Sequence, residues 1–151
     1  MMRRAGIRPV VAGEKTMQST VFALGRALVS PLFIISGIYK FMNVAGILGS
    51  TGTKNFMALI GGGAPPTWLG YLIASTELIF GLMILVGFKT KIAAVVLFLF
   101  TVAATLLGHQ FWIDPSQQTQ ALKNLAIMGA LLMLATTGAG ACSLDNRSQA
   151  A

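Results

Sequence analysis

The chain has 151 residues, of which 55% are hydrophobic and only 10% are charged, whereas a soluble domain carries about 25% charged residues. A chain this short has little interior, so it cannot hide that much apolar surface from water. These numbers argue against a soluble globular protein, and the nine Phe and eight Met exclude disorder. The class that remains is an integral membrane protein of one small domain.

The net charge is +7, from eleven Lys and Arg against four acidic residues. In a soluble protein this excess would indicate nucleic acid, but here the basic residues are scattered and four of them precede the first apolar run: Arg3, Arg4, Arg8 and Lys15. That placement is typical of a positive-inside topology signal, so no nucleic-acid partner is expected. The single cysteine, Cys142, excludes dithiol redox chemistry within one chain.

Continuous apolar runs without two-residue alternation predict membrane-spanning helices rather than strands. Four runs come close to the ~20 residues that a helix needs to cross ~30 Å of hydrocarbon; they cover 20–42, 67–88, 91–112 and 119–137. The expected fold class is all-α, an integral membrane four-helix bundle. We divide the chain into a basic cytoplasmic segment (1–18), the transmembrane domain (19–145) and a short cytoplasmic tail (146–151).

The connection 43–66 between the first two spans is long and rich in Gly. Within it Phe56, Leu59 and Ile60 fall on one helical face, which predicts a short amphipathic helix at the membrane interface. The connection before the fourth span is short and polar, and its Asp114 is placed to cap the segment that follows.

The distribution of Lys and Arg over the loops predicts the orientation of the chain. With the N-terminus inside, the inner side receives Arg3, Arg4, Arg8, Lys15, Lys89, Lys91 and Arg147, and the outer loops keep only Lys54. Both termini are therefore expected in the cytoplasm, with the long connection facing the periplasm or the cell exterior. Trp68 and Trp112 then lie at the outer ends of their spans, as an aromatic belt requires.

Five ionisable residues lie within or at the ends of the spans: Arg26, Lys40, Glu77, His109 and Lys123. Such groups cost about 2.5–3.5 kcal/mol at the centre of a helix, so they normally face the bundle and find partners. On the second span Glu77 shares a face with the small residues Gly70, Ala74 and Gly81. Small residues let helix backbones approach closely, so Glu77 is predicted to point at another helix.

Each of the other spans also has one stripe of small and polar residues. The stripes are Arg26, Ser30, Gly37 and Lys40 on the first span, Thr101, Thr105, Gly108 and His109 on the third, and Lys123, Ala126, Ala130 and Thr137 on the fourth. Four stripes facing one axis predict a polar interior. In its outer half we expect a cluster of Lys40, His109 and Lys123 with Glu77 as counter-ion, and Arg26 alone nearer the inner face.

Two interpretations of this cluster are open. In the first, Glu77 neutralises basic residues and fixes the register of the helices. In the second, the cluster is a pocket for a ligand with carbonyl or anionic oxygens, such as a quinone head group, to which Lys and His donate hydrogen bonds while Glu77 relays protons. A proton or ion path is a third alternative. No metal-ligand spacing or catalytic set occurs, so neither a metal nor catalytic residues are expected.

Several short motifs follow one another along most of the chain. They are Arg26, Phe33-Ile34-Ile35-Ser36-Gly37, Lys40-Phe41, Glu77-Leu78, Leu85-Val86-Gly87-Phe88, His109-Gln110-Phe111-Trp112, Lys123-Asn124-Leu125-Ala126, Gly138-Ala139-Gly140 and Ser143-Leu144-Asp145. This ordered set resembles the DoxX family of small bacterial four-helix membrane proteins. Family motif and physical interpretation agree at six candidate site residues: Arg26, Lys40, Glu77, His109, Lys123 and Asn124. The chain departs from the family's closing Gly-Pro-Gly at Ala139, which is expected to loosen that turn.

The resemblance implies a multi-pass protein of a bacterial inner membrane that is a subunit of a quinone-linked oxidoreductase or respiratory assembly. The first hypothesis is therefore a subunit that holds a quinone in the outer half of the bundle. It has no cofactor motif and no covalent cofactor is expected, so a protein partner must supply electrons. Whether the chain is itself an enzyme is left open. The alternative is a non-catalytic accessory subunit of a larger membrane complex, with transport of a small solute or protons third. A homo-oligomer is also compatible with the sequence.

Overall fold

A computed structural model describes residues 12–149 of the chain. The basic residues Arg3, Arg4 and Arg8 of the predicted N-terminal segment lie outside this range. The elements are α1 (Ala12–Met42), α2 (Val44–Leu48), α3 (Thr51–Leu59), α4 (Thr67–Val86), α5 (Thr90–Gly108), a 3-10 turn η1 (Pro115–Gln117), α6 (Gln118–Thr137) and α7 (Leu144–Gln149). The part of the chain that is described contains no strand, so the predicted all-α fold class is confirmed.

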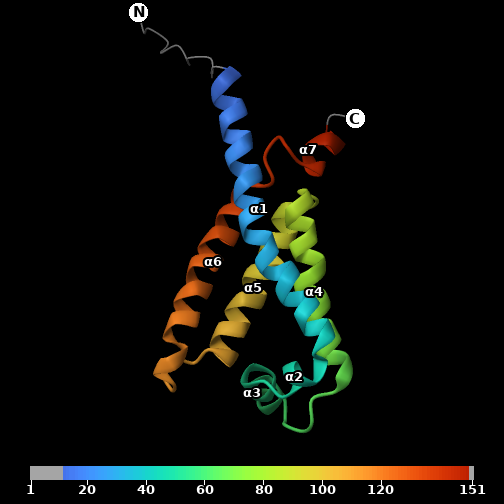
Figure 1. The fold of residues 1–151 in the computed structure, drawn as a ribbon, viewed down its shortest axis with the longest axis vertical. Helices are drawn as coiled ribbons and strands as arrows, with labels where there is room; N and C mark the ends of the chain where they lie inside the picture. The colour runs from blue at the N-terminus through green and yellow to red at the C-terminus, as the bar shows by residue number, and fades with distance from the viewer. Residues whose placement is uncertain (1–11, 150–151) are drawn as a thin grey trace, which may run out of the picture.

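Four of these helices (α1, α4, α5 and α6, the last together with η1) are long and apolar enough to cross a membrane. They form two pairs, α1 along α4 and α5 along α6, which are joined where α4 contacts α5 (Figure 1). We call the end of the bundle that carries α7 the termini end, and the end that carries α2, α3 and η1 the loop end. At the loop end the two pairs diverge, α2 contacts α4, and α3 contacts α5 (Figure 1).

The pair α1–α4 is held close by glycine on both helices. A Cβ atom at Gly37 would lie 2.8 Å from the backbone nitrogen of Leu78, and one at Gly81 would lie 3.0 Å from the Cβ of Phe33. On α4 the buried residues include Gly70, Ala74, Glu77 and Gly81. The predicted small-residue face of the second span, with Glu77 pointing at another helix, is therefore confirmed.

The interior is less polar than predicted, because the middle of the bundle is an apolar core made of Phe33, Ile84, Ala93, Ala94, Leu97, Leu131 and Leu134. The predicted stripe of the fourth span is wrong, since Lys123, Ala126 and Thr137 are all exposed. The buried face of α6 instead carries Ala121, Asn124, Leu131 and Leu134. Asn124 has a hydrogen-bond partner inside the bundle, whereas a long Lys side chain near a helix end can keep its charge at the aqueous boundary.

The predicted helix in the long connection exists as α3, and α2 precedes it. The side chain of Ser50 caps α3 by accepting a hydrogen bond from the amide of Thr53, and Asn43 caps α2 in the same way. The predicted cap at Asp114 is also confirmed, because its carboxylate accepts a hydrogen bond from the amide of Ser116 at the start of η1. These caps fix the loop end, where a cavity opens between the two helix pairs.

Candidate ligand pocket

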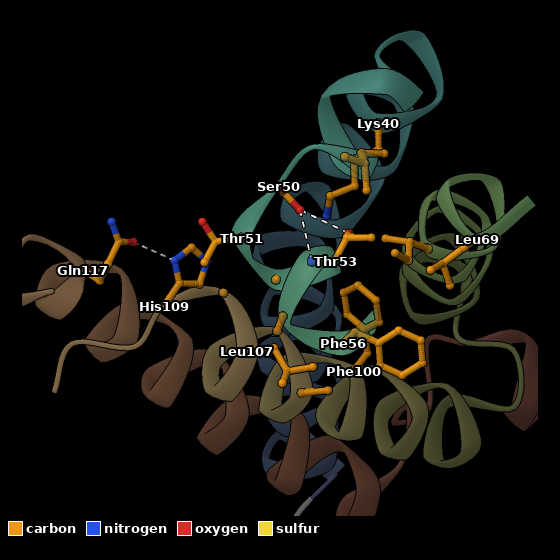
Figure 2. Close-up of a pocket in the computed structure, with 16 residues that line it drawn as sticks. Lys40, Ser50, Thr51, Thr53, Phe56, Leu69, Phe100, Leu107, His109 and Gln117 are labelled. Carbon is orange, nitrogen blue, oxygen red and sulfur yellow. Dashed lines mark hydrogen bonds between the residues drawn. The ribbon is translucent and has the colours of Figure 1, made fainter. Parts of the chain in front are cut away.

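A cavity of about 610 Å³ lies at the loop end, with walls from α3, α4 and α5. Pockets for small ligands typically measure ~300–1,000 Å³ and are mostly apolar with a few polar groups. Figure 2 shows how the lining side chains are arranged. The lining residues are Lys40, Ile47, Ser50, Thr51, Gly52, Thr53, Phe56, Leu69, Ile73, Phe100, Ala103, Ala104, Leu107, Gly108, His109 and Gln117.

The wall formed by α3 is fastened to α5 by two kinds of contact. The side-chain amide of Asn55 donates hydrogen bonds to the carbonyl oxygen of Leu107 (2.7 Å) and to the side chain of Gln110 (3.2 Å). Beside it, a Cβ atom at Gly52 would lie 3.3 Å from the Cα of Gly108, so the two backbones touch. Phe56 of α3 and Phe100 of α5 both line the cavity and contribute to a largely apolar wall (Figure 2).

Lys40 forms one polar end of the pocket. Its ammonium donates hydrogen bonds to the carboxylate of Glu77 (2.5 Å) and to the hydroxyl of Ser36 (3.0 Å), and Ser36 donates to the same carboxylate oxygen at 2.9 Å. A lysine ammonium has three N–H donors, so one donor is not used by these partners. The ammonium also lies 5.7 Å from the ring centroid of Phe100, within the range of a cation–π contact.

His109 and Gln117 form a second polar part of the lining, away from the rings of Phe56 and Phe100, which lie on the Lys40 side of the cavity (Figure 2). His109 Nδ1 lies 3.0 Å from the side-chain oxygen of Gln117. Because an amide oxygen only accepts, this contact assigns the proton to Nδ1 and leaves Nε2 of the neutral ring as an acceptor. The pocket therefore has a cationic donor at one end and an imidazole acceptor at the other.

The structure brings some of the predicted site residues together and keeps others apart. Lys40 and Glu77 form the expected ion pair, and Lys40 and His109 line one cavity. The predicted cluster with Lys123 is not formed, because Lys123 is exposed and does not line the pocket. Asn124 is buried away from the pocket lining, and its side-chain amide donates to the hydroxyl of Thr105 at 2.8 Å. The role of Lys123 and Asn124 in ligand binding stays a prediction.

Arg26 lies toward the termini end and is 3% exposed. The expectation that it is alone is wrong, because its guanidinium donates to the carbonyl oxygens of Ile84 (3.3 Å), Leu85 (3.1 Å) and Cys142. Arg26 thus joins α1 to the last turn of α4 and to the segment after α6. Sequence reasoning missed these partners because they are backbone groups, whose position no residue type reveals.

Asp145 is a second residue that sequence reasoning missed at the termini end. Its carboxylate accepts hydrogen bonds from the amides of Lys89 (2.6 Å) and Thr90 (2.9 Å), and so caps α5, whose own N-cap residue Lys89 makes no side-chain cap. Burial opposes ionisation of this carboxyl, but hydrogen bonds from Thr90 and Lys89 together outweigh it and hold the pKa of Asp145 below its usual value. The motif Ser143-Leu144-Asp145 was the one feature of the sequence that pointed to a role for Asp145.

The residues that α3 contributes to the pocket were also missed. The sequence predicts that Ser50, Thr51 and Thr53 lie in the long outer connection, whereas in the structure they line the cavity. The amphipathic pattern around Phe56 indicated a helix correctly, but it contained no information about the contact between α3 and α5.

The DoxX family model matches residues 21–110 of the chain. The chain belongs to the DoxX family. This match spans every pocket-lining residue except Gln117. Two curated relatives come from Escherichia coli (strain K12). The inner membrane protein YphA is 36% identical over an alignment that covers 82% of this chain and 87% of YphA. The inner membrane protein YqjF is 33% identical over an alignment that covers 87% of this chain and 94% of YqjF. A comparison with solved structures finds no match.

The names of these relatives and the four apolar helices together support a multi-pass protein of a bacterial inner membrane. As a membrane-embedded DoxX-family protein, the chain is in contact with the lipid bilayer. Consistent with this environment, large apolar side chains are exposed along the four spans, including Leu28 on α1, Ile79 on α4, Leu99 on α5 and Met133 on α6.

Proposed function

We propose that this DoxX-family protein binds a ligand of the quinone–quinol class in the pocket at the loop end. Such a ligand has a flat apolar ring with oxygen atoms at opposite edges. The observation that carries the proposal is one cavity of about 610 Å³ whose mostly apolar lining, which includes Phe56 and Phe100, also carries the polar side chains of Lys40 and His109. In this proposal one oxygen of the ring meets Lys40 and the other meets His109.

The chemistry of the two ends suits both redox forms of such a ligand. The remaining N–H of Lys40 donates to a quinone carbonyl or quinol hydroxyl oxygen, while the hydrogen bond to Glu77 orients the ammonium. Neutral His109 accepts from a quinol hydroxyl through Nε2, and protonated His109 donates to a quinone carbonyl. Reduction of a quinone consumes two electrons and two protons. In this proposal the electrons come from a partner protein in a membrane redox assembly.

The topology part of the proposal places both termini in the cytoplasm. The termini end carries Lys89, Lys91 and Arg147 around α7 and the turn before α5, whereas the loop end carries Lys54 in the long connection. Loops rich in Lys and Arg remain on the cytoplasmic side. The pocket then opens toward the periplasmic half of the bilayer. Labelling of single cysteines introduced at positions 58 and 147 in intact cells tests this orientation.

Ligand titration of the purified full-length protein tests the pocket. The protein in mild detergent is titrated with a short-chain benzoquinone and a short-chain naphthoquinone, and binding is followed by calorimetry. We expect Lys40→Met and His109→Phe each to weaken binding about tenfold, the effect of losing one hydrogen bond to a charged or buried group. Lys123→Met is the matched control, because it makes the same change on an exposed residue outside the pocket.

The outcomes separate the pocket from a general loss of structure. Circular dichroism and thermal unfolding check that each variant keeps the helical fold. If Lys123→Met weakens binding as much as Lys40→Met, or if neither Lys40→Met nor His109→Phe weakens it, the assignment of this pocket is wrong. If the wild-type protein binds neither quinone, the ligand class is wrong.

The accessory-subunit alternative is favoured by a different observation. Hydrogen bonds among the side chains of Lys40, Glu77 and Ser36 join α1 to α4. These residues therefore have a structural role without any ligand. Under this alternative Glu77→Leu lowers the yield of assembled protein, and no variant has a ligand-specific defect. Transport gains no support, because the apolar core residues Phe33 and Ile84 lie between Arg26 and Glu77 along their helices.

A further inference from the structure

A second cavity lies at the termini end, independent of the pocket described above. It measures about 500 Å³ and lies between the end of α4 and the segment that leads into α7. Its lining residues are Val86, Ala141, Cys142, Ser143, Leu144 and Arg147. Two of these, Val86 and Leu144, are exposed apolar residues, and Arg147 is the one charged residue in the lining. The cavity therefore combines apolar walls with a cation.

The charge around this cavity is strongly positive. Among the side chains that the structure describes at this end, four are cationic (Arg26, Lys89, Lys91 and Arg147) and one, Asp145, is acidic. The carboxylate of Asp145 already accepts hydrogen bonds from the amides of Lys89 and Thr90. This arrangement leaves a positive field at the point where a membrane span ends.

Arg147 is the cation in this group that is placed to receive a ligand. Arg26 uses its guanidinium on three carbonyl oxygens, and the stem of Lys91 lies against Gly138. Arg147 is exposed, and its guanidinium makes no hydrogen bond or ion pair with any side chain that the structure describes. A planar guanidinium matches the geometry of a phosphate group, with which it forms two parallel hydrogen bonds.

We propose that the termini-end cavity binds the phosphate headgroup of an anionic phospholipid, with Arg147 as the principal phosphate ligand and Lys89 adding long-range attraction. A lipid fits better than a free phosphate ion because the apolar walls at Val86 and Leu144 suit the first carbons of an acyl chain or glycerol. The location also agrees, because α4 is a membrane span that ends at Val86. Basic pockets between helices at the membrane boundary are typical sites for anionic headgroups.

Native mass spectrometry of the purified full-length protein tests this site. The protein in mild detergent is titrated with phosphatidylglycerol and, separately, with phosphatidylcholine that has the same acyl chains. We expect preferential retention of phosphatidylglycerol, and Arg147→Gln should weaken it about fivefold, the effect of one basic residue near a charged lipid surface. Lys54→Gln is the matched control, because it removes an exposed cation at the opposite end of the bundle.

A second variant and inorganic phosphate make the outcomes decisive. Val86→Trp fills the cavity without changing any charge, and it should also weaken retention of phosphatidylglycerol. If Arg147→Gln and Lys54→Gln have equal effects, or if Val86→Trp has none, the cavity is not the site. If inorganic phosphate alone binds as tightly as phosphatidylglycerol, and Val86→Trp weakens neither, the site binds phosphate alone and the lipid assignment is wrong.

Discussion

At the loop end Lys40 pairs with the carboxylate of Glu77, whereas at the termini end Arg26 donates to the backbone carbonyl oxygens of Ile84, Leu85 and Cys142. Both arrangements stabilise a cation inside a membrane bundle, where an unpartnered charge is costly. They differ in whether a hydrogen-bond donor of the cation remains available to a ligand. The ion pair leaves a donor of Lys40 for a ligand in an open cavity, while the carbonyl contacts hold three segments of the chain together and close the bundle.

The largest expected effect is at the closed end. Arg26→Met leaves the partly buried carbonyl oxygens of Leu85 and Cys142 without their donor, while that of Ile84 keeps the amide of Gly87. We expect a loss of about 4 kcal/mol of unfolding free energy at ~1–3 kcal/mol per unsatisfied group. Unfolding by denaturing detergent in mixed micelles, followed by circular dichroism, measures this loss. The exposed Lys123→Met serves as the reference. Equal stability of these two variants would show that the carbonyl contacts contribute little.

The ion pair at the open end should respond in a non-additive way. Glu77→Leu leaves Lys40 without its carboxylate, and we expect a loss of about 2 kcal/mol because the lysine is only half-buried. The double variant Lys40→Met with Glu77→Leu should recover most of this loss, since replacing a whole buried pair by apolar groups is often neutral. The same unfolding assay gives the coupling energy. Additive losses would contradict direct pairing.

The cap at Asp145 predicts a smaller effect that depends on pH. Asp145→Ala should cost about 1 kcal/mol, the usual value of a helix cap. Because the pKa of this carboxyl is lowered in the folded protein, its contribution is complete above the ordinary carboxyl pKa of about 3.9 and is lost as the pH falls below that value. Stability measured between pH 7 and pH 3 should therefore fall more steeply in the wild type than in Asp145→Ala. Parallel curves would contradict the cap.

The smallest expected effect is at the contact between α5 and α6. Asn124→Ala removes the hydrogen bond to Thr105, and we expect a loss of about 0.6 kcal/mol, the average for such bonds inside membranes. Asn124 is not in the pocket lining, so quinone titrations should be unchanged. A change in ligand binding without a change in stability would show that Asn124 belongs to the pocket.

The sequence was sufficient where a property repeats along one helix. Apolar runs of membrane-spanning length located α4, α5 and α6 to within four residues and the end of α1 at Met42, although α1 begins at Ala12, eight residues before the predicted run. The small-residue face around Glu77 correctly predicted both a close helix contact and a partner of opposite charge, because Lys40 and Glu77 lie on the two helices that pack most closely. These features depend on local pattern and on the cost of burying charge.

The sequence was insufficient where a side chain binds the backbone of a distant segment. Arg26, Asp145 and Asn55 all have backbone partners, and any residue type supplies the same carbonyl or amide. The predicted buried face of the fourth span was wrong for another reason. Lys123 and Asn124 are adjacent, so a rotation of about 100° decides which one is buried, and small residues on α6 occur on an exposed face as well.

The carboxylate that caps α5 belongs to a residue 55 positions further along the chain than the amide it binds. During synthesis the first amides of α5 therefore cannot receive this cap until the ribosome has completed α6 and the turn after it. The contact that closes the termini end is thus among the last to form. A chain that stops before Asp145 contains all four spans but lacks the carboxylate that caps α5.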